Sequence, residues 1–331
     1  MRRGWRRRKR SRGGRWRVSD VRPGRVVIVG GCGFIGSRLA NALAARGADV
    51  TVADIAPPPA DLDSRCRVEE RDVRRAAGLR GVARGAEAVF ALAAKLKKTC
   101  EEDPACGWQT NVLGMANLLD EVIASGSRPR VVFTSSGGVY DPDGTVFPTP
   151  ESGALRAIGL YAASKLAGEG MVAASAAAGG FSAVIFRPFT VFGAGPAAGE
   201  RGHFIAHWLE LAAAGRPLTL HGDGCGTVDL TCVDDAVRAL EMAARAPIPP
   251  RQCRTYNLGG GTETPVAEVA RWMREADPSI TVTHTAAPHQ SPSRQSADMR
   301  RIREELGYEP AVHPRDEIRR LVEARLGGAG R

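Results

Sequence analysis

The sequence is poor in aromatic residues and has no long apolar run. Phe, Trp and Tyr make up 5% of the 331 residues, whereas Ala and Gly are frequent, which favours closely packed helices. A membrane-spanning helix needs about 18 or more consecutive apolar residues, so we expect none. The hydrophobic share of 43% still suffices for a buried core.

Paired cysteines and metal-ligand clusters are also missing. The seven cysteines are scattered and form no C-x-x-C pair. An odd, scattered set in a chain of this size favours reduced thiols over a disulfide framework, so we expect a cytoplasmic protein. His203 and His207 have a spacing that can hold zinc, but Phe204 stands where the zincin pattern needs Glu. We therefore expect no metal site.

The net charge of +10 comes from one end of the chain. Residues 1–17 contain ten Lys and Arg and no acid, and the rest of the chain has 36 basic and 36 acidic residues. The body thus offers no basic surface for nucleic acid, and we expect no such partner and no membrane partner. We expect a disordered basic tail at 1–17. It is an arm for nucleic acid or membrane, the charged part of a signal peptide, or an extension before a true start at Val18; the glycines that interrupt the following apolar run argue against the signal peptide.

Alternating apolar runs and Ala-rich amphipathic stretches predict an α/β fold. Continuous Val, Ile and Phe runs are typical of strands that are covered on both faces. Strand–helix alternation then predicts a Rossmann-type, doubly wound parallel sheet at 24–187, with a smaller α/β substrate lobe over most of 188–331 and some segments returning to the sheet. The predicted strands are 25–30, 49–54, 86–94, 130–136 and 182–188, and the predicted helices are 36–47, 203–215, 264–276 and 298–307. In the second half, Trp208 and Trp272 are predicted to pack in the lobe, and Asp234 and Asp235 to begin a helix.

A glycine-rich turn follows the first predicted strand. Gly30, Gly33 and Gly36 form G-x-x-G-x-x-G, with Phe34 and Ile35 inside the turn, directly before the first helix. This pattern lets backbone N–H groups approach a pyrophosphate and packs the helix on the strand. Asp54 ends the second strand, where a carboxylate accepts hydrogen bonds from ribose hydroxyls and repels a 2′-phosphate. We therefore predict NAD as the cofactor.

Three polar residues predict a catalytic group. Tyr161 and Lys165 are four residues apart at the start of an Ala-rich helix, so they share one face. An ammonium favours tyrosinate, so we expect Lys165 to lower the pKa of Tyr161 and let it exchange a proton with a sugar hydroxyl. Ser136 lies at the carboxyl end of a predicted strand, where open α/β sheets bind ligands. We expect Ser135 rather than Ser136 to serve as a turn-capping serine.

These motifs resemble those of the NAD-dependent epimerase/dehydratase family of extended short-chain dehydrogenases. The resemblance rests, in chain order, on GGCGFIGS, FALAA, NVLGMANLL, FTSSGGVY, YAASK, FRPFTVFGAG, PLTLHGDG and VDLTCVDDAVRAL. It implies a Rossmann domain with a substrate lobe, bound NAD and a homodimer. It also implies Tyr161 as general base, Lys165 on the nicotinamide ribose, and Ser136 on the substrate hydroxyl. By position, the further cofactor-site residues are Asp72, Val73, Ala93, Ala94 and Asn111.

Several positions depart from the family pattern. Gly137 and Gly138 replace the acidic pair that dehydratases use for water elimination, which argues against dehydration. Thr190, Val228 and Pro288 stand where relatives have diphosphate-binding Asn or Arg, so the diphosphate contacts must differ. Arg201, Arg216 and Arg294 are candidates to replace them, and we expect Thr190 and Arg294 to contact substrate.

The leading hypothesis is a nucleotide-sugar epimerase of the 4-epimerase type, which removes and returns a hydride through NAD. One alternative is an NAD(P)-dependent sugar ketoreductase or dehydrogenase, because the same three side chains serve net hydride transfer. Another is a non-catalytic NAD-binding sensor or scaffold. A sugar without a nucleotide, or a polyketide-like carbonyl compound, also remains open as the substrate.

Overall fold

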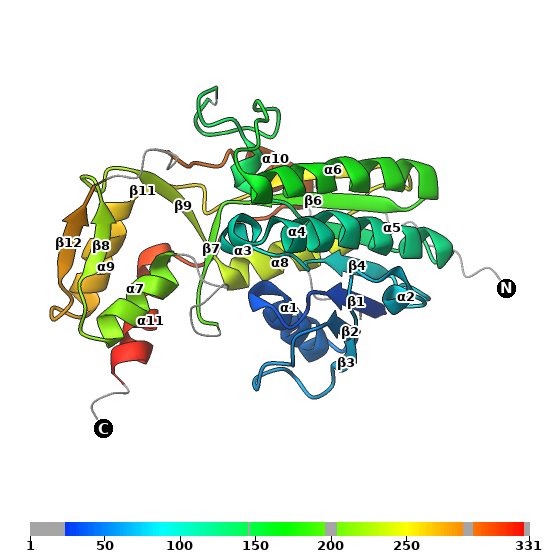
Figure 1. Cartoon of the computed structure of the whole chain (residues 1–331), viewed down its shortest axis with the longest axis horizontal. Helices are drawn as coiled ribbons and strands as arrows, with labels where there is room; N and C mark the ends of the chain where they lie inside the picture. Colours follow the sequence, from blue (N-terminus) through cyan, green and yellow to red (C-terminus); the bar gives the residue numbers. More distant parts are fainter. Residues whose placement is uncertain (1–23, 145, 196–203, 287–293, 328–331) are drawn as a thin grey trace, which may run out of the picture.

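The computed structural model describes residues 24–144, 146–195, 204–286 and 294–327 (Figure 1). The tail 1–17, Arg201, His203 and Pro288 lie outside these residues. Within the described residues, no helix combines the length and the apolar character needed to span a bilayer.

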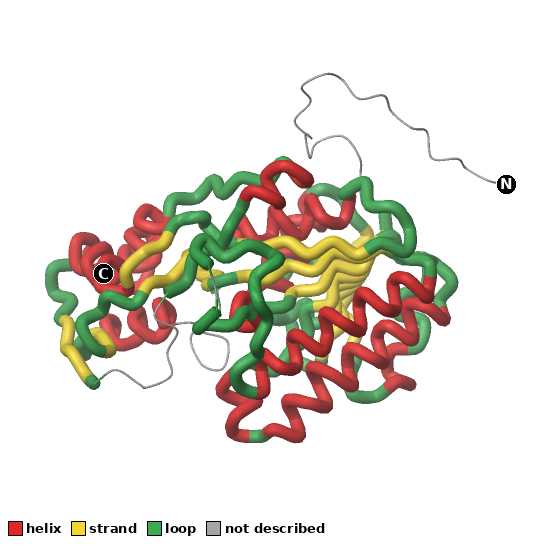
Figure 2. The backbone as a smooth tube through the Cα atoms, turned by 90° about the horizontal axis from the view of Figure 1, so that it is seen from above, coloured by secondary structure: helices red, strands yellow, loops and turns green. Residues whose placement is uncertain are grey.

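A seven-stranded parallel sheet forms the centre of the molecule, which confirms the predicted α/β fold. All five strands predicted from the apolar runs belong to it, and the strand after residue 187 that joins its edge is a returning segment. Figure 2 shows the strands side by side with helices on either side. In spatial order the strands are β10 (Cys253–Leu258), β6 (Ser182–Pro188), β5 (Arg130–Thr134), β4 (Ala88–Ala91), β1 (Arg25–Val29), β2 (Asp49–Asp54) and β3 (Arg67–Glu70).

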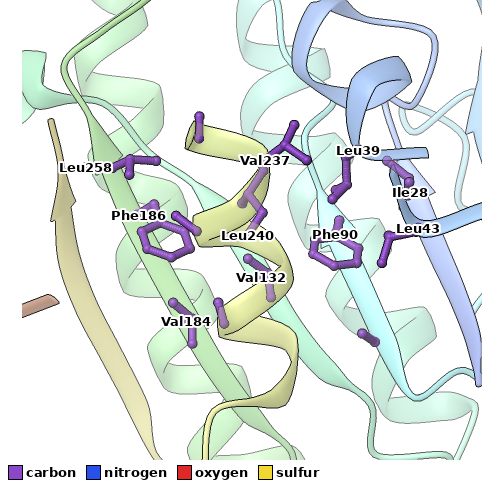
Figure 3. Close-up of a cluster of buried hydrophobic side chains, with 14 of the residues drawn as sticks. Ile28, Leu39, Leu43, Phe90, Val132, Val184, Phe186, Val237, Leu240 and Leu258 are labelled. Atoms are coloured by element: carbon purple, nitrogen blue, oxygen red, sulfur yellow. The ribbon is translucent and has the colours of Figure 1, made fainter. Parts of the chain in front are cut away.

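Alternating side chains of the strands enter two separate apolar cores. On β1, Val26 and Ile28 face one core, whereas Val27 and Val29 face the other, because successive strand residues point to opposite faces. The first core is covered by α1 (Phe34–Ala45) and α8 (Val233–Arg245), with Leu39, Leu43, Val237 and Leu240 among its buried side chains (Figure 3). The second is covered by α2 (Ala76–Leu79), α5 (Gly114–Ala124) and α6 (Leu160–Gly179).

A smaller lobe follows the sheet and contains the third apolar core. Trp208 and Trp272 are buried there, as predicted, and Asp234 and Asp235 lie in the first turn of α8. The three helices predicted in the second half are confirmed within a few residues. The lobe comprises β7 (Thr190–Phe192), α7 (Phe204–Ala213), β8 (Leu218–His221), β9 (Thr227–Cys232), β11 (Glu263–Pro265), α9 (Val266–Ala276), β12 (Val282–Thr285) and α11 (Pro314–Leu326), and α10 (Arg300–Leu306) packs near β10.

The strand order reverses direction between β1 and β4. From β1 the chain winds outward through β2 and β3, and from β4 it winds the other way through β5 and β6. Ligands of such sheets bind at the carboxyl ends of the strands, where the winding reverses. Short elements crowd this edge: α3 (Lys97–Glu102), α4 (Pro104–Trp108), the π-helical turn η1 (Gln109–Leu113) and the 3₁₀ turn η2 (Gly137–Val139).

Candidate active site

The glycine turn between β1 and α1 has three glycines with different tasks. Gly30 has a φ of 85°, and a Cβ there would lie 2.4 Å from the backbone N of Ala93. A Cβ on Gly36 would lie 2.4 Å from the carbonyl O of Gly30. A Cβ on Gly33 would meet only that same oxygen, at 3.3 Å. Gly30 and Gly36 are therefore required by packing, whereas Gly33 keeps the space above the turn open.

This open space fits the pyrophosphate of a dinucleotide. Gly33 is the N-cap of α1 and makes no side-chain capping bond, so the N–H groups of Phe34 and Ile35 have no partner within the helix. Free N–H groups and the positive end of the helix dipole favour an anion at this place. The turn is thus a cradle that a Cβ at Gly33 would fill.

Asp54 lies at the carboxyl end of β2, next to the glycine turn. One carboxylate oxygen accepts a hydrogen bond from the N–H of Cys32 at 2.9 Å, and the other accepts one from the N–H of Ala56 at 2.9 Å. Because each carboxylate oxygen can accept more than one bond, the group can brace the turn and still bind a ribose hydroxyl.

The other predicted cofactor residues line the same edge. Ala93 lies against the glycine turn, and Ala94 follows it after β4. Asp72 and Val73 come directly after β3. Hydrogen bonds from Arg74 lower the pKa of the Asp72 carboxyl, so it stays charged. All four residues are therefore placed at the carboxyl edge of the sheet, on the two sides of the glycine turn.

Tyr161 and Lys165 lie on one face of α6, above the end of β5. The Lys165 ammonium is buried and donates a hydrogen bond of 2.8 Å to the carbonyl O of Thr134, the last residue of β5. The same nitrogen lies 5.8 Å from the centre of the Tyr161 ring and 5.1 Å from that of Phe133. The structure therefore brings the predicted phenol and ammonium together.

The pKa values of this pair correct one prediction. Burial raises the pKa of Tyr161 to about 12, and the Cys100 thiol contributes in the same direction. Burial lowers the pKa of Lys165 to about 8. The prediction that Lys165 lowers the pKa of Tyr161 is wrong for the protein's own groups, because loss of solvation is the main influence on the phenol and raises its pKa.

Ser136 is partly exposed just beyond β5, two residues after the carbonyl that Lys165 binds. Its Oγ accepts a hydrogen bond of 3.1 Å from the N–H of Gly138 and so caps η2. Ser135 is buried instead, and its Oγ donates to the Glu169 carboxylate at 2.6 Å. The prediction that Ser135 rather than Ser136 caps a turn is therefore wrong, because Ser136 is the capping serine. Its own O–H proton stays available for a substrate oxygen.

Gly137 packs flat against an aromatic ring. A Cβ at this position would lie 3.2 Å from the ring of Phe189. A larger side chain here would therefore require the Phe189 ring to shift by a few tenths of an ångström.

Asn111 lies in the π-helical turn η1 and is buried. Its Oδ1 accepts from the N–H of Lys95 at 2.7 Å, and its Nδ2 donates to the carbonyl O of Lys95 at 3.0 Å and to Ser164 Oγ at 2.9 Å. The carboxamide thus joins the loop after β4 to α6. Its place is beneath the cofactor edge, as a support for the loop that contains Ala93 and Ala94.

The predicted substrate residues lie on the lobe side of this edge. Thr190 Oγ1 donates to Gln295 Oε1 at 3.3 Å. Arg294 donates from Nε and Nη2 to the Glu263 carboxylate, both at 2.6 Å, and its guanidinium lies 4.4 Å from the Phe147 ring centre. The charge of Arg294 is therefore already paired. No local pattern marks Phe147, Glu263 or Gln295, because their contacts join segments far apart in the chain.

The remaining candidates are less closely connected to the site. Val228 is buried in β9, and Arg216 lies between α7 and β8. His207 lies on α7, and no group of three His, Cys, Asp or Glu side chains in the described part of the chain is arranged to hold a metal ion.

Known proteins are similar to this chain in sequence and in fold. A family model described as NAD dependent epimerase/dehydratase family matches residues 26–259. A UDP-glucose 4-epimerase of Mycolicibacterium smegmatis is 30% identical over 309 residues, which cover 90% of this chain and 97% of the relative. The structure of UDP-glucose 4-epimerase with UDP-glucose from Thermotoga maritima matches with a TM-score of 0.85 and 26% identity, covering 92% and 99% of the two chains. MoeE5 in complex with UDP-glucuronic acid and NAD matches with a TM-score of 0.79 and 28% identity, covering 91% and 98%.

Proposed function

Because this chain belongs to the NAD-dependent epimerase/dehydratase family, we propose that it is a nucleotide-sugar 4-epimerase. The observation that supports this most directly is the placement of Tyr161, Lys165 and Ser136 around the end of β5, on the same edge as the open glycine turn. Residues 24–187 would hold NAD, and most of 188–331 would hold the sugar nucleotide.

The proposed roles follow from the contacts of each side chain. Bound NAD supplies hydride acceptance and return at the sugar carbon. The Gly30–Gly36 turn and the N-terminus of α1 hold the pyrophosphate, and Asp54 holds the adenosine ribose. Asp72, Val73, Ala93 and Ala94 line the same cleft, and Asn111 supports its loop.

Tyr161 is the proposed general base. Its phenol oxygen takes the proton of the sugar hydroxyl as the carbon is oxidised and returns it as the carbonyl is reduced. A pKa near 12 would leave too little phenolate at neutral pH, so the site needs further positive charge near the ring when the reaction occurs. Lys165 lies near the ring and holds the nicotinamide ribose, and Ser136 donates its hydroxyl proton to the substrate oxygen.

The proposed substrate is a UDP-hexose. The relatives that cover about nine tenths of this chain include UDP-glucose 4-epimerases, which supports this class. Thr190 and Arg294 on the lobe side would contact the nucleotide end. Since Arg294 is paired with Glu263, it would bind mainly through its remaining N–H groups rather than through a free charge.

Purified protein incubated with UDP-glucose tests the proposal. The expected result is formation of UDP-galactose without added NAD and without a lasting absorbance change at the wavelength of the reduced cofactor. A stoichiometric rise of that absorbance would instead support the dehydrogenase alternative. Native mass spectrometry with a panel of nucleotide sugars would identify the retained dinucleotide and the preferred base and sugar together.

We also propose a homodimer that works in the cytoplasm. None of the seven cysteines, all of which lie within the described residues, forms a disulfide bond, which suits a reducing compartment. Trp108, Leu113 and Ile123 are 41%, 48% and 43% exposed on the consecutive elements α4, η1 and α5, and a second copy would cover them. Light scattering coupled to gel filtration measures this directly; a monomeric mass would contradict the dimer.

A further inference from the structure

A buried chain of polar side chains lies behind the catalytic edge. Glu169 on α6 accepts hydrogen bonds from Ser135 Oγ at 2.6 Å and from Nε and Nη2 of Arg187 at 2.9 and 2.6 Å. Glu169 is 7% exposed and Arg187, on β6, is 5% exposed. Burial is the largest single influence and would lower the pKa of Arg187, but the hydrogen bonds and charge interactions with Glu169 and Tyr140 together outweigh it, so the pKa is raised and the guanidinium stays charged.

One end of this series of hydrogen-bonded side chains reaches the catalytic groups. Tyr161, Lys165 and Glu169 are spaced four residues apart along α6 and therefore share one helix face. Lys165 binds the carbonyl O of Thr134, and Glu169 binds the next residue, Ser135. Two consecutive residues at the end of β5 are thus held by the catalytic helix, immediately before Ser136.

The other end reaches the substrate side. Arg187 Nη1 donates to the Tyr140 hydroxyl at 3.1 Å, which in turn donates to Asn257 Oδ1 at 2.6 Å. Asn257 Nδ2 donates to the carbonyl O of Thr149 at 2.7 Å. Thr149 pairs with the segment 294–298 through backbone bonds to Ser296 at 2.7 Å and from Asp298 at 2.9 Å. The chain of contacts therefore continues into the segment that carries Arg294 and Gln295.

We propose that Glu169, Arg187 and Tyr140 are positioning residues. They hold two parts of the active site in place, and the buried Glu169–Arg187 ion pair connects these two parts. The Ser135 end fixes the distance between Ser136 and the Tyr161–Lys165 face. The Tyr140 end fixes the position of the segment 294–298. None of the three touches reacting atoms. A buried ion pair contributes little net stability compared with apolar side chains of similar size, so its value here lies in fixed geometry. The kinetic consequence rests on the proposed epimerase function.

Two variants remove one hydroxyl at each end and leave the Glu169–Arg187 pair intact. Ser135→Ala is expected to lower kcat for UDP-glucose about tenfold with KM unchanged, since small misplacements of catalytic groups slow the chemical step. Tyr140→Phe is expected to raise KM by about tenfold with kcat unchanged, since it loosens the substrate segment rather than the catalytic groups. A general loss of structure would lower the active fraction, and so kcat, in both variants alike.

Matched substitutions elsewhere serve as controls. Ser182 accepts a hydrogen bond of 2.7 Å from Arg130 at the start of β6, the opposite end of that strand from the catalytic edge. Tyr256 is buried next to Asn257 but packs in the α8 core, and its hydroxyl donates to Glu305 at 2.8 Å. Ser182→Ala and Tyr256→Phe are expected to leave both kcat and KM as in the parent protein.

Amide hydrogen exchange measures positioning without any turnover. Ser135→Ala is expected to speed exchange in residues 134–139 and leave 294–298 unchanged, whereas Tyr140→Phe is expected to do the reverse. This pattern in a protein that does not convert UDP-glucose supports the positioning proposal and rejects only the epimerase function. Unchanged exchange in both segments, or equal falls in kcat at constant KM in both variants, overturns the positioning proposal.

Discussion

The Lys165 ammonium donates a hydrogen bond of 2.8 Å to the carbonyl oxygen of Thr134, across the gap between α6 and the end of β5. This bond joins the helix that carries Tyr161 to the strand that leads to Ser136. It also leaves a charged group with a neutral acceptor in a buried place, which is why burial lowers its pKa to about 8. Burial of the Lys165 ammonium lowers the stability of the folded protein, and this loss can be measured.

Replacing Lys165 by Met is expected to stabilise the folded protein at pH 7. Because the folded-state pKa is lowered to about 8, the unfolded chain binds the proton more tightly, and the ammonium opposes folding below that pH. The penalty fades as pH rises from about 8 to the ordinary Lys value. After the lost bond to Thr134 is allowed for, the expected gain at pH 7 is about 2 kcal/mol.

Denaturant unfolding of both proteins, with the dinucleotide removed, measures this gain at pH 7 and pH 10. The difference should shrink toward zero at the higher pH. A Lys165→Met protein that is less stable than the parent at both pH values would contradict the assigned cost of the buried ammonium.

Tyr161→Phe is expected to lower kcat by a factor of about 10² to 10⁴, the range typical of a lost general base. Only the phenol oxygen is removed, so the melting temperature and the amount of copurified NAD should stay close to those of the parent. Product formation from UDP-glucose gives the rate. Full activity in this variant would reject the catalytic role of Tyr161, and a parent without any turnover but with bound NAD would favour the sensor or scaffold alternative.

Gly33→Ala is expected to weaken NAD binding about 100-fold while the protein still folds. The added Cβ meets only the Gly30 carbonyl oxygen, at 3.3 Å, and otherwise occupies the space proposed for the pyrophosphate. Gly170→Ala is the control, because a Cβ there has nothing within 4 Å and the residue lies inside α6. The control should bind NAD normally and gain about 0.5 to 1 kcal/mol of stability. Calorimetric titration measures the NAD affinity of both variants. Equal affinities of the Gly33→Ala and Gly170→Ala proteins would show that the turn does not hold the dinucleotide.

Asp229 should make the stability of the protein fall between pH 4 and pH 6. It is fully buried in β9, and burial raises its pKa to about 6, although it accepts hydrogen bonds from the N–H groups of Ala297, Gly260 and Gly261. A raised folded-state pKa means that the stabilising contribution is present below about pH 4 and lost as pH rises through 6. Relative to Asp229→Asn, the free energy of unfolding of the parent should drop by about 2 to 3 kcal/mol over this interval. Parallel pH profiles of the two proteins would disprove the raised pKa.

Much of the central sheet was predictable because its strands are apolar on both faces. Runs such as 25–30 and 182–188 stay buried under helices on each side, so composition alone marks them. The edge strands β3 and β10 were not predicted, since RVEE and CRTYNL mix polar and apolar residues. The short lobe strands, such as the three-residue β7 and β11, depend on pairing with distant segments and leave no local pattern.

In the active site, too, features within one or two elements were predictable, whereas contacts between distant segments were not. The glycine turn and the Tyr161–Lys165 pair are spacings within one or two elements, and the structure brings each of them to the catalytic edge. The Glu169–Arg187 pair joins α6 to β6 and could be recognised only after folding, although Glu169 repeats the four-residue step of Tyr161 and Lys165. The direction of the Tyr161 pKa was misjudged because spacing reports a neighbouring charge but not the loss of solvation.

The proposed epimerase reaction requires that one bound dinucleotide takes a hydride from the sugar and gives it back. UDP-glucose carrying deuterium at C4 tests it most directly, with NMR analysis of the product formed by purified protein in ordinary water. The expected product is UDP-galactose that retains the deuterium at C4. Loss of the deuterium to solvent, or its accumulation in a released reduced cofactor with no UDP-galactose formed, would contradict it.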